Sequence, residues 1–270
     1  MKNMVIASPI LSDQAVISTS ESPSGLPGSN LQNMAIKQVW RSLDSMNAWI
    51  IAQMPEGGFD LIAVLGHNGS SQCSARVRAA DTESNLTASP SYDSGYLPAR
   101  SHQVGYALPD EVGAMPANHF IHILAAPQSY EFWRIDFNDP NTEYFDAGRL
   151  YISKIFQPAT NMSYNLQEGI VDPSRVSVTV SGRVSSKKNP KRRYIDLNLD
   201  FATEAEMRED SFDIEYSQGV TGDVLIIPDP DAGAYLQKRT IYGRLTALAP
   251  TISAAFRIFQ KNYRIEEITA

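Results

Sequence analysis

The first half of the chain alternates apolar and polar positions with a period of two. In the segment FWRIDF, the apolar residues Trp133, Ile135 and Phe137 occupy every second position. This spacing is typical of a strand whose two faces have different surroundings. The turn-forming sequence NDPN at 138–141 follows, and 148–152 then reads as a second strand. The pattern predicts two strands of a β-sandwich, with the aromatic face turned inward.

Other short runs extend this pattern. The segment 59–65, FDLIAVL, is a nearly continuous apolar run and predicts a central strand buried on both faces. Residues 75–79 alternate cleanly, and 120–124 is a further apolar run. Residues 4–11 predict a strand at a sheet edge, because Pro9 lacks the amide that a central strand needs. Short strands joined by long loops favour an antiparallel jelly-roll β-sandwich.

A stretch containing Pro, Asn and Gly divides the chain. We place an N-terminal jelly-roll domain at 1–160, a linker at 161–174 and a second domain at 175–270. The fold class is mainly β in both domains, and the second domain carries one helix.

The second domain begins with a predicted long β-hairpin formed by 176–180 and 195–201, each alternating valine or other apolar residues with polar ones. Thr203 and Glu206 fit a capping box, in which each side chain binds a free amide of the other residue. A helix is therefore expected from 204 to about 217.

Composition and charge narrow the classes of function. The 270 residues carry a net charge of −7, which argues against a general nucleic-acid or anionic-membrane binder. Cys73 is the single cysteine, so no disulfide can form within the chain. No apolar run reaches the length of a membrane span, and the N-terminus lacks the apolar core of a signal peptide. We expect a soluble protein made in a reducing cytoplasm.

Little in the chain indicates catalysis. His119 and His122 lie three apart on a predicted strand, face opposite sides and cannot share a metal ion. His67 and Asn68 follow a buried strand, where the imidazole either serves a site or bonds to nearby backbone. No phosphate-binding loop, nucleophile elbow or zinc motif occurs. We expect no enzyme activity, no catalytic residue, no cofactor and no metal.

A basic loop interrupts the predicted hairpin. It places six positive charges in eleven residues: Arg183, Lys187, Lys188, Lys191, Arg192 and Arg193. The loop is either a solvated tip, a contact for an acidic protein neighbour, or a phosphate-binding surface. Aromatic residues, on which bases would stack, are nearly absent there.

A sugar site is a further hypothesis. Asp93, Tyr96, Tyr106, Trp133 and Arg134 combine the aromatic and polar side chains that bind sugars. The alternative is that Trp133 belongs to the core, as expected for a Trp within an alternating strand.

Ordered motifs in the first domain carry a resemblance. They are NL at 30–31, WRS at 40–42, LGHN at 65–68, WRI at 133–135 and GRL at 148–150. Over about 25–156 the chain resembles the galactose-binding-like, discoidin-type jelly roll found in tail proteins of tailed bacteriophages. The resemblance implies that any ligand binds in loops at one end. It marks five motif positions as ligand candidates: His67, Asn68, Trp133, Arg134 and Arg149.

The second domain, over about 175–268, resembles the belt domain of phage distal tail proteins, which shares the tail-tube fold. The residues that carry this resemblance are RYIDL at 193–197, the helix after Thr203, the strand at 224–230 and IYGRL at 241–245. It implies a β-sandwich or barrel that assembles into a homo-oligomeric ring of six copies, or alternatively three. It also implies a location in the virion, at the tail tip or baseplate. The implied partners are the tail tube protein and the baseplate hub proteins, with tail fibres or host-surface glycans as further ones, and the basic loop becomes an oligomer interface. The alternative is a carbohydrate- or receptor-binding module for host attachment.

Overall fold

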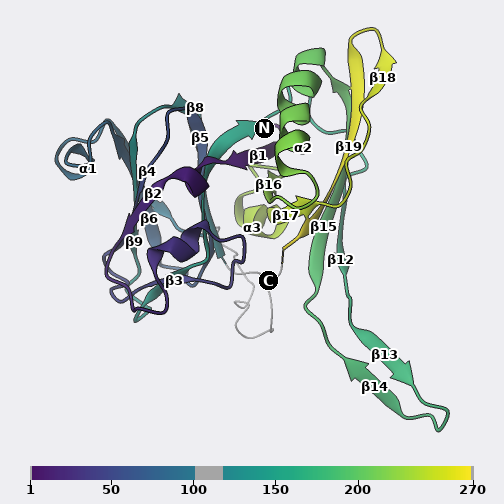
Figure 1. Cartoon of the computed structure of the whole chain (residues 1–270), viewed down its shortest axis with the longest axis horizontal. Coiled ribbons are helices and arrows are strands. Elements are labelled where there is room, and N and C mark those ends of the chain that lie inside the picture. Colours follow the sequence, from purple (N-terminus) through teal and green to yellow (C-terminus); the bar gives the residue numbers. More distant parts are fainter. Residues whose placement is uncertain (1, 101–117, 269–270) are drawn as a thin grey trace.

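A computed structural model describes residues 2–100 and 118–268, and the fold is mainly β. Figure 1 shows a β-sandwich on one side, a sheet with an attached helix on the other, and a hairpin that projects away from both. The sandwich is a jelly roll made of two facing antiparallel sheets. Its outer sheet contains, in spatial order, β2 (Val16–Thr19), β4 (Ala48–Gln53), β9 (Phe132–Asn138), β6 (Ser74–Ala80) and β7 (Tyr92–Pro98).

The inner sheet of the sandwich extends into the second domain. Its sandwich part contains β1 (Val5–Ile10), β11 (Arg149–Phe156), β5 (Phe59–His67) and β8 (Asn118–Gln128). Two short strands, β3 (Trp40–Ser42) and β10 (Phe145–Ala147), pair at the rim. Short helical turns occupy Leu11–Gln14, Gly28–Gln32 and, as α1, Asn85–Ala88.

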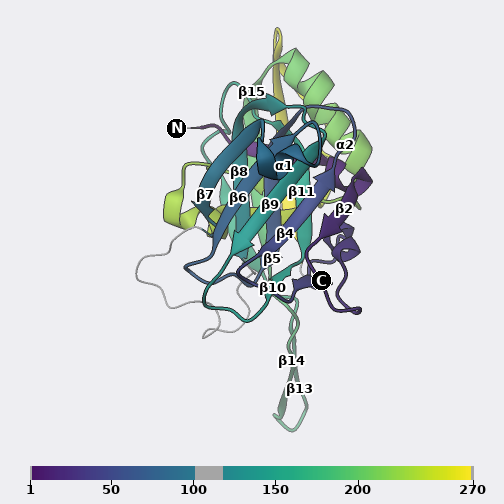
Figure 2. The same cartoon turned by 90° about the vertical axis from the view of Figure 1, so that its left-hand side faces the viewer.

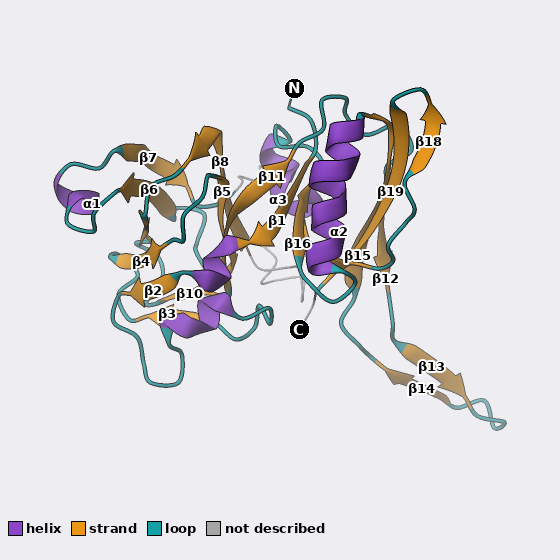
Figure 3. Cartoon of the chain, turned by 45° about the horizontal axis from the view of Figure 1, so that its top comes forward, coloured by secondary structure: helices purple, strands orange, loops and turns teal. Residues whose placement is uncertain are grey.

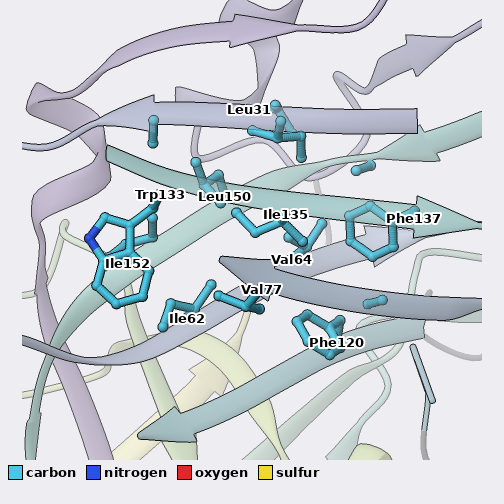
Figure 4. Packing of buried hydrophobic residues seen from close by; sticks show 14 of the residues in the cluster. Leu31, Ile62, Val64, Val77, Phe120, Trp133, Ile135, Phe137, Leu150 and Ile152 are labelled. Atoms are coloured by element: carbon cyan, nitrogen blue, oxygen red, sulfur yellow. The ribbon is translucent and has the colours of Figure 1, made fainter. Parts of the chain in front are cut away.

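The jelly-roll core confirms the period-two prediction. Trp133, Ile135 and Phe137 are buried between the two sheets, as Figure 4 shows. Phe59 meets Trp133 edge-on, with ring centroids 6.5 Å apart. The indole N–H of Trp133 donates to the carbonyl of Tyr130 at 2.9 Å, so the only polar atom of this ring is satisfied. Burying each large apolar side chain contributes roughly 1.5–3 kcal/mol.

The second domain continues the same sheet beyond β1. The strands follow in the order β16 (Val224–Ile227), β17 (Ile241–Leu245), β19 (Ile258–Glu267), β15 (Arg192–Ala202) and β12 (Gln167–Val171), and β18 (Ile252–Ala255) pairs with β19. The sheet is open, and no closed barrel forms among the described residues. A barrel was one of the two forms expected for the second domain.

The helix of the second domain begins at the expected capping box. The Thr203 amide donates to the Glu206 carboxylate at 2.6 Å, and the Glu206 amide donates to the Thr203 hydroxyl at 3.3 Å. A π-helical segment, Glu206–Ser211, leads into α2 (Phe212–Gln218), which covers one face of the sheet (Figure 3). A short 3-10 turn, Gly233–Tyr235, precedes a second helix, α3 (Leu236–Arg239). The sequence predicted only one helix for this domain.

The stretch 161–174, suggested as a linker, contains β12, which pairs with β15. Two predictions about pairing were wrong. β1 lies between β11 and β16 rather than at an edge, and Pro9 fits because the register with β11 shifts between Ala7 and Ile10. Residues 176–180 do not pair with 195–201. Instead β13 (Arg175–Val178) pairs with β14 (Val184–Lys187) to form the projecting hairpin, called the tip from here on.

Candidate functional site

The solvent-facing side of the outer sheet gathers arginine, aspartate and aromatic side chains. Figure 2 shows this sheet toward the viewer, on the side of the molecule away from the second domain. We call the following residues the outer face: Trp49, Arg76, Arg78, Asp93, Tyr96, Arg134 and Asp136. They meet because the sheet register places Asp136 between Trp49 and Arg76, and Arg76 beside Tyr96.

Ion pairs hold the outer face in order. Asp136 accepts hydrogen bonds from Arg78 at 2.7 Å and from Arg134 at 2.8 Å. Arg76 donates to Asp93 at 2.9 Å, and this pairing lowers the pKa of Asp93 to about 2. Three guanidinium groups therefore share two carboxylates, which leaves one excess positive charge.

Aromatic rings flank these charges at both ends. The Arg134 guanidinium lies 5.0 Å from the centre of the Trp49 ring, and that of Arg76 lies 5.4 Å from the Tyr96 ring. Tyr96 is 66% exposed, and Trp49 is half-buried. Rigid arginine and carboxylate groups beside aromatic rings can bond to sugar hydroxyls while a ring covers an apolar sugar face. We refer to this arrangement on the solvent-facing side of the sheet as the platform.

Two of the five motif positions have structural roles at the strand end. His67 is buried, its Nδ1 accepts from the Gly69 amide at 3.1 Å, and its Nε2 lies 3.0 Å from the Ala99 carbonyl. Burial lowers the pKa of this imidazole to about 4. The Asn68 side chain accepts from the Asp146 amide at 2.8 Å and donates to the Tyr144 carbonyl at 3.0 Å. The imidazole therefore bonds to nearby backbone, the alternative given above for His67.

The other three motif positions, Trp133, Arg134 and Arg149, lie in three different places in the structure. Trp133 is fully buried in the core and cannot reach a ligand, whereas its neighbour Arg134 lies on the outer face. Of the hypothesised sugar-site residues, Asp93 and Tyr96 join Arg134 there, and Tyr106 lies outside the described residues.

Arg149 belongs to a buried cluster between the two domains. Its guanidinium donates to both Asp13 oxygens at 2.7 and 2.8 Å and to Asp223 at 3.0 Å. The Tyr242 hydroxyl also donates to Asp223. Burial raises the pKa of Tyr242, and the nearby Asp223 charge adds to this rise. Sequence reasoning missed both aspartates, because nothing local links positions 13, 149 and 223.

The six basic loop residues divide between the tip and the sheet. Arg183, Lys187 and Lys188 are exposed at the tip, and Lys191 lies between the tip and β15, 3.8 Å from Asp172. Arg192 and Arg193 are the first two residues of β15. Arg193 donates to Glu267 at 2.9 Å and to the Lys238 carbonyl at 2.7 Å, and has a structural role.

Other chemistry in the described residues is limited. Burial raises the pKa of the Cys73 thiol to about 12. No group of three or more His, Cys, Asp or Glu side chains in residues 2–100 and 118–268 is arranged to hold a metal ion. None of the helices in this part of the chain is long and apolar enough to cross a membrane.

Comparison with known proteins finds similarity at the level of structure alone. No family model matches the sequence, and no curated protein matches it. A family 32 carbohydrate-binding module of Clostridium perfringens NanJ in complex with galactose is similar at 12% identity and a TM-score of 0.39, over 55% of this chain and 98% of that one. The lectin domain of Lectinolysin complexed with Lewis b antigen shows 9% identity and a TM-score of 0.40, over 55% and 98%. A fucose-binding module of Streptococcus pneumoniae shows 5% identity and a TM-score of 0.38, over 54% and 98%.

Proposed function

We propose that the jelly-roll domain binds carbohydrate through the outer face. The observation that carries this role is the platform in which Trp49 and Tyr96 flank three arginines and two aspartates. The excess positive charge favours a glycan that carries carboxylate or phosphate groups. The similar structures named above include sugar complexes, but the proposal rests on the residues of this face.

Binding of the full-length protein to immobilised neutral and acidic oligosaccharides tests this role. We expect binding that weakens about two- to tenfold in Tyr96→Ala, if a sugar ring stacked on Tyr96 contributes as much as an aromatic pair, roughly 0.5–1.5 kcal/mol beyond area burial. Gln53→Ala, an exposed change on the same sheet, is the matched control and should bind as the wild type does. Failure of the wild type to bind any oligosaccharide would overturn the proposal. Equal binding by Tyr96→Ala and the wild type would show that carbohydrate does not bind at the outer face.

A second role is assembly, which the tip favours. Its four valines, Val176, Val178, Val180 and Val184, are each more than 60% exposed. An isolated two-stranded hairpin is at best marginally stable in water, and exposed strand edges invite pairing with another chain. We propose that the tip is covered when copies of the chain form a ring. This role agrees with the resemblance to phage tail-tip proteins, whose partners would be the tail tube and hub proteins.

The solution mass of the purified protein and negative-stain images of the same sample test assembly. We expect a closed ring for the wild type and a monomer when 175–187 is replaced by a short Gly-Ser turn. A wild-type monomer at every accessible concentration would contradict the role, because the tip would then be stable without a partner. Neither proposed role involves catalysis.

A further inference from the structure

The tip has two different faces. Directly opposed residues in an antiparallel pair point to the same side, and successive residues along a strand point to opposite sides. Val178 pairs with Val184, and Val176 shares their side, which makes one face apolar. Arg175 pairs with Lys187 on the other face. The segment 173–195 contains no acidic residue, so the tip is both amphipathic and uniformly basic.

A cleft of about 550 Å³ lies at the opposite end of the molecule, between α2 and the strands β1 and β11. Leu11, Ile155 and Ile214 contribute apolar side chains to its lining. Tyr216, which is 84% exposed, stacks on Phe212 at the helix surface, with ring centroids 5.8 Å apart. The cleft therefore offers apolar surface that residues 2–100 and 118–268 leave uncovered.

Carboxylates crowd the helix side of this cleft. Glu209, Asp210 and Asp213 line it and form no ion pair among the described residues. Burial raises the pKa of Asp210, and repulsion from neighbouring carboxylates, Glu209 and Asp213 among them, raises it further. Lys154 is the cation that lines the cleft in the described structure. The site is thus acidic where the tip is basic, and apolar where the tip carries valines.

We propose that the tip of one copy docks into the cleft beside α2 of a second copy, a contact that rests on the assembly role proposed above. The tip of the same copy is not a candidate, because Figures 1 and 2 both show tip and α2 at opposite ends of the molecule. Tip and cleft are different surfaces, so the contact is head-to-tail and every copy uses both. Such contacts close into rings when the rotation permits.

Charge reversal in the full-length protein tests the docking. The tip variant carries Arg183→Glu, Lys187→Glu and Lys188→Glu, and the cleft variant carries Glu209→Lys, Asp210→Lys and Asp213→Lys. Each variant alone should shift from the assembled mass to the monomer mass. In each case the tip of one copy and the cleft of the next copy carry charges of the same sign and repel each other. An equimolar mixture should regain a mass above that of the monomer, since the tip of each variant then meets a cleft of opposite charge on the other variant. Circular dichroism verifies that each variant is folded.

A control with the same number of reversals separates docking from net charge. Glu56→Lys, Asp81→Lys and Glu83→Lys change exposed residues of the jelly roll and should leave the assembled mass unchanged. Assembly that persists in both test variants would overturn the docking and leave the assembly role standing. Monomeric variants whose mixture stays monomeric would overturn it as well. A wild type that never assembles would overturn both proposals.

Discussion

The buried cluster around Arg149 joins the two domains, and its removal should destabilise both. Asp13 lies in the jelly roll, and Asp223 directly precedes β16 of the second domain. Arg149→Met keeps a long unbranched side chain but removes the charge. The substitution would leave Asp223, whose side chain is 6% exposed, with the Tyr242 hydroxyl but without its cation.

The magnitude follows from this burial. Removing one partner of a buried ion pair costs about 3–5 kcal/mol, because the remaining charge stays away from water. Asp13 is 38% exposed and regains solvent, so most of the cost comes from Asp223. For a chain of this size the melting temperature should fall by roughly 2–4 °C per kcal/mol, or about 6–20 °C in all.

Urea unfolding at pH 7, followed by tryptophan fluorescence and circular dichroism, measures the change. The double variant Arg149→Met with Asp223→Asn should recover part of the lost stability, because no charge then remains buried. Noncoincident transitions by the two probes would indicate that the domains unfold separately once the cluster is lost. A loss below about 1 kcal/mol for Arg149→Met would refute the reasoning, since that value is typical of an exposed pair.

Three further changes test other parts of the fold by the same urea assay. Gly148→Ala should lower the free energy of unfolding by about 1–3 kcal/mol, because the added Cβ would overlap the backbone of Ile36. Gly25→Ala is the control: its Cβ would enter open space, and its stability should stay within about 0.5 kcal/mol of the wild type. Thr203→Ala should cost about 1 kcal/mol through loss of the helix cap, and a smaller loss in Thr203→Ser would confirm the hydroxyl as the cause. Stability should fall as the pH drops from 7 to 5. Burial lowers the pKa of His67 to about 4 in the folded chain, whereas the pKa of a histidine in the unfolded chain is near 6.5. The unfolded chain therefore takes up the proton at a higher pH than the folded chain does. A His67→Gln variant should show a weaker dependence on pH, and an unchanged dependence would contradict this account.

Strands with a complete local pattern were predictable from the sequence. The run 59–65 lies within β5, buried between β11 and β8, and the alternation of Trp133 to Phe137 matches the buried face of β9. The Thr203 capping box also formed as expected. Each of these features depends on residues that are close together in the chain. For the two strands, the apolar pattern alone decides which side faces the core.

Features that depend on distant residues were not predictable. The valines of the tip have the spacing of a buried strand, yet each is more than 60% exposed. The outer face is brought together by strand register, which places Arg76 and Arg78 beside Asp136. The sequence had nominated Asp93, Tyr96 and Arg134 for a sugar site, but it did not show the register that brings them together. The buried charge of Arg149 is intelligible only once Asp13 and Asp223 are seen beside it.

The position of β1 has a consequence for the order in which the chain can fold during synthesis. β1 precedes both of its neighbours in the chain, because Ile6 pairs with Phe156 on one side and with Ile226 on the other. The strand must therefore keep one edge open until β16 has been made. Pairings between such distant segments form slowly, and an open edge is prone to pairing with other chains. An N-terminal truncation that removes β1 should therefore impair the maturation of both domains together.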